Sequence, residues 1–100
     1  MKLQAWLAIA VILLPSKALA DDIAQGRLLA QQRCAPCHAI APHQRDEVAD
    51  SPAFEVIARK YGFDEATIAA AVLAPHPRMN WTFTPRQAKE IAAYINSLPR

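Results

Sequence analysis

The chain has 100 residues, with 11 lysines and arginines against 9 aspartates and glutamates, so its formal net charge at pH 7 is +2. It holds no long run of like charge, which argues against nucleic acid or an anionic membrane surface as a partner. A chain of this length makes one small domain, which buries too little apolar surface to be comfortably stable on its own.

The first 20 residues have the layout of a secretory signal peptide. A short basic start is followed by an almost unbroken apolar run, Leu3 to Leu14, and then by an Ala-x-Ala pattern that ends at Ala20. The run is shorter than the ~20 apolar residues of a spanning helix, which favours cleavage after Ala20 over an uncut membrane anchor. We therefore expect residues 1–20 to be a signal peptide and residues 21–100 to form one exported, periplasmic domain without stable membrane insertion. Two lysines leave with the signal, so 9 basic side chains then balance the 9 acidic ones.

A first helix is expected from Asp21 or Asp22, either of which can cap its N-terminus, through Arg33. Gly26 interrupts this helix. A glycine inside a helix costs ~1 kcal/mol relative to alanine, so we expect Gly26 to mark a close contact with another helix. The apolar stripe of the helix consists of Ile23, Ala30 and Cys34, with Leu28 and Leu29 beside it.

The sequence Cys34-Ala35-Pro36-Cys37-His38 follows at the end of this helix. Two cysteines separated by two residues and followed at once by a histidine are typical of a c-type haem attachment site. Cys34 and Cys37 can each bond one vinyl group of a single porphyrin, and His38 then supplies a proximal nitrogen ligand to the iron. Pro36 restricts the backbone between the two thiols, which reduces the entropy lost on attachment.

Two other kinds of site share the Cys-x-x-Cys spacing. A thioredoxin-like redox pair belongs to a strand-to-helix turn of a βαβ pattern, and the sequence shows no strand pattern. A zinc site needs two further ligands at suitable spacing, and the chain has no other cysteine and only two other histidines, His43 and His76. The motif therefore favours one covalently bound haem c as the cofactor.

Three more helices are expected after a loop at residues 39–50. A serine followed by a proline starts a helix over 51–62, an aspartate starts another over 64–74, and a capping box starts the last over 84–98. The inward-facing apolar residues are Phe54, Ile57, Ala58, Tyr61, Ile68, Ala69, Val72, Leu73, Ala88, Ile91, Ala92, Ile95 and Leu98, with Tyr94 at the edge of the last helix. The predicted fold class is all-α, with about four short helices.

The loop at residues 75–80 is stiffened by two prolines and carries a candidate sixth ligand for the iron. Met79 is the only methionine of the mature chain, and a thioether is a soft ligand that suits haem iron and raises its reduction potential. His76 is the rival ligand in the same loop. His43 is a weaker rival, because it lies only five residues beyond His38 and would struggle to reach the opposite face.

Residues 21–100 resemble the small monohaem class I cytochromes c over nearly their whole length. Gly26, the Cys-Ala-Pro-Cys-His motif, Met79 in a proline-bearing loop and Ile91-Ala92-Ala93-Tyr94-Ile95 follow that family's order of features. The resemblance implies a cytochrome c-like fold in which the first and last helices cross, with Gly26 against Tyr94. The family's lysine-rich front face is missing here, so docking through a positive ring is not implied.

The resemblance also implies that a proline carbonyl holds the other ring nitrogen of His38. Pro52 best matches that proline and Pro42 is a weaker candidate, although the family often has glycine where Ser51 stands. Candidates for contact with the haem or its propionates are Arg45, Arg59, Lys60, Arg78, Trp81 and Phe83, with a solvated surface position as the alternative for the charged side chains and core packing for the aromatic ones.

The function that this resemblance implies is one-electron transfer between Fe(II) and Fe(III), and not catalysis, with His38 and Met79 as the two axial ligands. The sequence shows no Ser/His/Asp set, paired-carboxylate site or glycine-rich phosphate loop that would point to an enzyme. Expected partners are a periplasmic dehydrogenase, reductase or terminal oxidase, and the protein itself is expected to be a monomer. Two alternatives stay open: an obligate haem subunit of a periplasmic dehydrogenase, and a ligand sensor or peroxidase-like enzyme with a labile sixth ligand.

Overall fold

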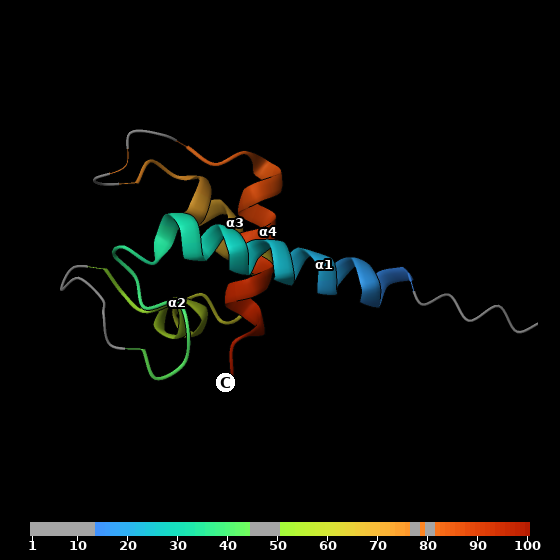
Figure 1. Ribbon diagram of the computed structural model, residues 1–100, viewed down its shortest axis with the longest axis horizontal. Helices are drawn as coiled ribbons and strands as arrows, with labels where there is room; N and C mark the ends of the chain where they lie inside the picture. The colour runs from blue at the N-terminus through green and yellow to red at the C-terminus, as the bar shows by residue number, and fades with distance from the viewer. Residues whose placement is uncertain (1–13, 45–50, 77–78, 80–81) are drawn as a thin grey trace, which may run out of the picture.

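The computed structural model describes residues 14–44, 51–76, 79 and 82–100, and every regular element in this part of the chain is helical (Figure 1). The elements are α1 (Leu14–Leu29), a π-helical turn η1 (Ala30–Cys34), α2 (Phe54–Lys60), α3 (Glu65–Leu73) and α4 (Pro85–Ser97). The predicted all-α class with about four helices is confirmed. Among the described residues, no helix combines the length and the apolar character needed to cross a membrane.

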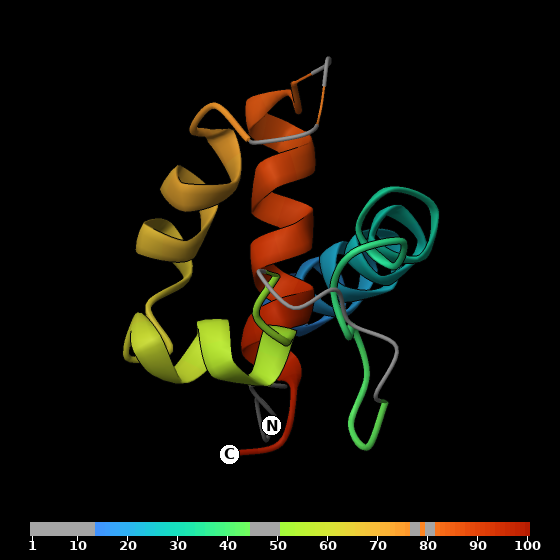
Figure 2. The same ribbon diagram turned by 90° about the vertical axis from the view of Figure 1, so that its left-hand side faces the viewer.

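Helix α4 is the centre of the fold, and α1, α2 and α3 pack against it. Figure 2 shows α4 standing between α3 and α1. The predicted capping box at its start is confirmed, because the Thr84 hydroxyl accepts from the Gln87 N–H and the Gln87 side chain accepts from the Thr84 N–H. Its predicted apolar face is buried as well, and the buried apolar residues are Ala88, Ile91, Ala92, Ala93, Tyr94, Ile95 and Leu98.

Helices α1 and α4 cross in close contact at Gly26. A Cβ atom added to Gly26 would lie 1.9 Å from the carbonyl oxygen of Glu90 and 2.9 Å from the Cβ atom of Tyr94. Both distances are shorter than van der Waals contact, so only a residue without a side chain allows the two backbones to approach this closely. The expected helix contact at Gly26, and its pairing with Tyr94, are confirmed.

The first helix starts earlier than the sequence predicts. Helix α1 already includes Leu14, and Lys17-Ala18-Leu19-Ala20 are good helix formers that continue it into residues 21–29 without a break. Asp22, one of the two expected caps, lies in the second half of α1, so the predicted start is wrong. Its buried carboxylate pairs instead with Arg86 at 3.2 Å and with Lys89 at 3.9 Å, which ties α1 to the first turns of α4.

The boundaries of α2 follow tertiary contacts as well as local signals. The helix starts at Phe54, three residues after the expected cap Ser51, so the prediction that Pro52 is its first residue is wrong. The Phe54 N–H donates to the carbonyl of Ala39 at 2.9 Å, and this bond joins the start of α2 to the loop that follows η1. Gly62 follows the end of the helix at φ +62°, the left-handed conformation expected there.

The predicted apolar stripes are correct except at two leucines. Leu28 in α1 is 50% exposed and Leu73 in α3 is 39% exposed. Leu28 directly precedes Leu29, and Leu73 directly follows Val72. Leu29 and Val72 both pack against the core. Leu28 and Leu73 therefore lie at the solvent-facing edges of their helices.

Tyr94 joins α4 to the loop after η1 and is expected to be important for stability. Its ring is buried and lies edge-on to Phe54, with 6.3 Å between ring centroids, and its hydroxyl donates to the carbonyl of Ile40 at 2.6 Å.

Tyr94→Ala should lower the free energy of unfolding by ~3 kcal/mol or more, as for other buried aromatic residues. Tyr94→Phe, the matched control, keeps the ring and leaves only the carbonyl unpaired, for a loss of ~1–3 kcal/mol. Urea unfolding followed by circular dichroism measures both losses, and a near-neutral Tyr94→Ala would contradict the packing.

Candidate functional site

An apolar cavity of about 520 Å³ lies between the end of η1, α2, α3 and α4. All four side chains predicted to hold a cofactor line it: Cys34, Cys37, His38 and Met79. The sequence motif and the loop before α4, about 40 residues apart in the chain, therefore meet at one cavity.

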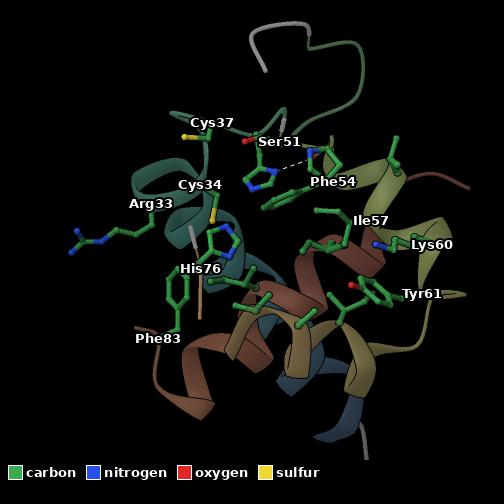
Figure 3. A pocket seen from close by; sticks show the side chains of 18 of the residues that line it. Arg33, Cys34, Cys37, Ser51, Phe54, Ile57, Lys60, Tyr61, His76 and Phe83 are labelled. Carbon is green, nitrogen blue, oxygen red and sulfur yellow. Dashed lines mark hydrogen bonds between the residues drawn. The ribbon is translucent and has the colours of Figure 1, made fainter. Parts of the chain in front are cut away.

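The walls of the cavity suit a flat apolar group. In Figure 3, Cys34 and Phe83 line one side of the cavity, and Ile57 of α2 and Tyr61, directly after α2, line the other. Its volume falls in the ~300–1,000 Å³ range of pockets that bind small molecules and cofactors. The apolar lining residues are Phe54, Val56, Ile57, Ile68, Ala71, Val72, Phe83, Ile91 and Ile95. Two thiols, an imidazole and a thioether facing such a surface form a donor set that fits a covalently attached haem.

The π-helical turn η1 positions the two cysteines. The Ala35 N–H bonds back to the carbonyl of Ala30, five residues earlier, which is the widened spacing of a π-helix. The carbonyl of Cys34 then accepts from both the Cys37 N–H, at 3.1 Å, and the His38 N–H, at 2.9 Å. The motif thus closes into one tight turn, and both sulfur atoms and the imidazole reach the same cavity.

The electrostatics of the cysteine pair do not suit a thiol–disulfide oxidoreductase. Both cysteines are free. Burial raises the pKa of Cys34 to about 11, and the neighbouring Cys37 adds to the rise. Redox-active Cys-x-x-Cys pairs work through a thiolate with a lowered pKa, so a thiol this hard to ionise lacks their main property.

His38 is held in one orientation by a backbone carbonyl. Its Nδ1 lies 2.6 Å from the carbonyl oxygen of Pro52, and because that oxygen can only accept, Nδ1 carries the proton. The lone pair of the other nitrogen, Nε2, is then available as a metal ligand. The expected proline is therefore Pro52 and not Pro42. The ring of Phe54, at 5.6 Å between centroids, packs beside the imidazole.

The second predicted ligand region brings two candidates to the cavity. Met79 and His76 both line it, and the Met79 N–H donates to the His76 carbonyl at 3.3 Å. The imidazole of His76 lies 5.9 Å from that of His38, between ring centroids. Burial, together with the nearby His38, lowers the pKa of His76 and favours its neutral form. His43 is exposed at φ 64° and does not line the cavity.

Only some of the other side chains considered as neighbours of the haem line the cavity. Phe83 and Lys60 line the cavity, whereas Arg59 does not. Arg45, Arg78 and Trp81 lie outside the described residues. The sequence analysis missed Arg33 and Val56 as lining residues, because both stand outside the apolar periodicity from which the core was predicted.

Comparison with curated proteins finds one close relationship. The chain is 41% identical over 93 residues to cytochrome c-552 from Bradyrhizobium diazoefficiens, and the match covers 92% of this chain and 89% of that protein. No protein-family model matches the chain, and no solved structure matches it significantly.

Proposed function

Because this chain belongs to the family of small c-type cytochromes, we propose that it carries single electrons through one haem c bound at the cavity. The observation that carries this proposal is the convergence of Cys34, Cys37, His38 and Met79 on one apolar surface. When bound, the haem supplies a one-electron Fe(II)/Fe(III) couple. The side chains of the protein hold it, set its potential and shield it from water.

Cys34 and Cys37 form the covalent attachment. Each thiol would be held to the porphyrin by one thioether bond, formed by adding the S–H across a vinyl double bond, so the attachment would need no oxidant or reductant. The two backbone hydrogen bonds to the Cys34 carbonyl hold the turn that presents both thiols to the same cavity. A large apolar group fixed here also gives a small domain the core that its own side chains cannot provide.

His38 and Met79 are the proposed axial ligands. The hydrogen bond from His38 to Pro52 fixes the imidazole tautomer and makes Nε2 a stronger ligand. The thioether of Met79 is soft and raises the reduction potential of the iron. With both axial positions filled, no coordination site stays open for a substrate, and this favours an electron carrier over an enzyme.

Export to the periplasm, with cleavage after Ala20, is part of the proposal, and its support is the signal-like layout of residues 1–20.

The proposed partners are a periplasmic dehydrogenase, reductase or terminal oxidase. Val56 and Lys60 line the cavity and are exposed, so its rim is open where such a partner can dock. Weak, transient docking is expected for electron transfer. A monomeric elution volume for the holoprotein would argue against the alternative, an obligate subunit of a dehydrogenase.

The test of the axial ligation is the substitution Met79→Ala. The wild-type protein should show a methionine–iron charge-transfer band when oxidised, and a pyridine haemochrome spectrum of the two-thioether type. Met79→Ala should lose the band and have a markedly lower midpoint potential, because the soft ligand is gone. Unchanged spectra would remove Met79 from the sixth position and assign that position to His76.

A further inference from the structure

From the two imidazole rings that share the cavity, we infer that His76 is a second ligand for the sixth coordination position, so that the protein has a Met79-ligated and a His76-ligated state. This inference rests on the proposed haem function and deepens it. His76 contacts the ring of His38 and lines the same cavity as Cys34 and Cys37.

The spacing of the two rings is compatible with two imidazoles that share one metal ion. Nitrogens bound at about 2 Å on opposite sides of a metal lie about 4 Å apart, which places the ring centroids about 6 Å apart. The centroids of His38 and His76 are 5.9 Å apart.

No competing interaction holds the imidazole of His76 in the described part of the chain. His76 is exposed, and none of the side-chain hydrogen bonds among the described residues involves its ring nitrogens. The Nδ1 proton of His38, by contrast, is bonded to Pro52. Turning the His76 ring toward the cavity therefore breaks no hydrogen bond among these residues.

The exchange of Met79 for His76 needs only a local rearrangement. The Met79 N–H donates to the His76 carbonyl at 3.3 Å, so the two candidate ligands lie close together in the structure. Both residues lie between the end of α3 at Leu73 and the start of α4 at Pro85, outside the two helices. Pro75, directly before His76, restricts the backbone there.

The two states would differ in redox properties. A thioether is a soft ligand that favours Fe(II), whereas an imidazole gives a lower potential and so favours Fe(III). The equilibrium between the Met79-ligated and His76-ligated states depends on how strongly each ligand prefers Fe(II) or Fe(III). Oxidation should therefore move population from the Met79-ligated state toward the His76-ligated state, and the carrier would have a second, lower potential.

The experiment uses the holoprotein with Met79→Leu, which removes the thioether at nearly constant volume. Met79→Leu alone should stay six-coordinate and low-spin when oxidised. The reduced form of Met79→Leu should bind CO at least about tenfold more weakly than the reduced form of Met79→Leu/His76→Ala. A tenfold difference is expected if His76 occupies the sixth position in about nine-tenths of the Met79→Leu molecules. Met79→Leu/His43→Ala is the matched control, because His43 is exposed and lies away from the cavity, and it should behave like Met79→Leu.

Equal CO affinity in Met79→Leu and Met79→Leu/His76→Ala, with a high-spin oxidised iron in both, would overturn the role of His76. That result leaves the proposed function intact so long as the wild-type protein shows covalent haem and the methionine band. Failure of the proposed function is seen in a different sample, the wild-type protein, as a missing haemochrome or a missing methionine band.

Discussion

Replacing both Cys34 and Cys37 by alanine is expected to give a protein without covalent haem that is largely unfolded. The cavity that the two thiols line has a volume of about 520 Å³ and walls of phenylalanine, isoleucine and valine. Without an attached group these walls face water or collapse, and about 25 cal/mol is lost for each Å² of apolar surface left exposed. Small domains have only ~5–15 kcal/mol of stability in total, so the loss of this filling removes most of it.

The measurement combines a haem stain after denaturing electrophoresis with far-ultraviolet circular dichroism of the purified chain. The single variants Cys34→Ala and Cys37→Ala are the controls, because each keeps one thioether bond and should retain the stain with a shifted pyridine haemochrome band. A double variant that stays folded without haem would show that the core of the four helices is sufficient by itself, and would contradict the central role given to the cavity.

The features that the sequence predicted well are set by residues close together in the chain. The Cys34–His38 motif is one such feature, and the structure turns it toward the cavity through hydrogen bonds within five residues. The capping box at Thr84 is another, since both of its bonds join residues three apart. The helix crossing at Gly26 is long-range, yet its signal was local, because a glycine inside a helix is costly unless it has a reason.

The features that the sequence predicted wrongly depend on distant partners. Asp22 was expected as a helix cap, but its carboxylate binds Arg86, which is 64 residues away. Ser51 and Pro52 read as a helix start, but the Pro52 carbonyl is engaged by His38, 14 residues earlier. A capping signal describes only what a residue can do locally, and a tertiary partner of higher charge or better geometry overrides it.

The residues of the candidate site were also predicted only in part. The motif gave three of the four proposed haem-binding residues, and the uniqueness of the methionine in residues 21–100 gave Met79. His76 was named only as the rival ligand, and the structure brings its ring to 5.9 Å from that of His38, between centroids. Both rings line the same cavity, which the sequence pattern alone does not show.

Substituting Gly26 by alanine should destabilise the protein by at least about 3 kcal/mol, the upper end of the range for overpacked cores. The added Cβ would lie 1.9 Å from the carbonyl oxygen of Glu90. That oxygen belongs to the backbone of α4 and cannot rotate away like the end of a side chain, so α1 and α4 have to separate. Separation also strains the ion pair from Asp22 to Arg86 and the packing of Tyr94, which lie on the same interface.

The control is Gly62→Ala, because it changes the other glycine of the chain in the same way without a clash. A Cβ at Gly62 meets nothing within 4 Å, but φ is +62°, so the substitution costs only the left-handed strain of about 1–2 kcal/mol. Urea unfolding of the two oxidised holoproteins gives both values under one set of conditions. A cost for Gly26→Ala no larger than that for Gly62→Ala would mean that α1 and α4 do not cross in backbone contact. The cavity would then lose its frame, because η1 continues α1 and Ile91 and Ile95 of α4 form part of the wall.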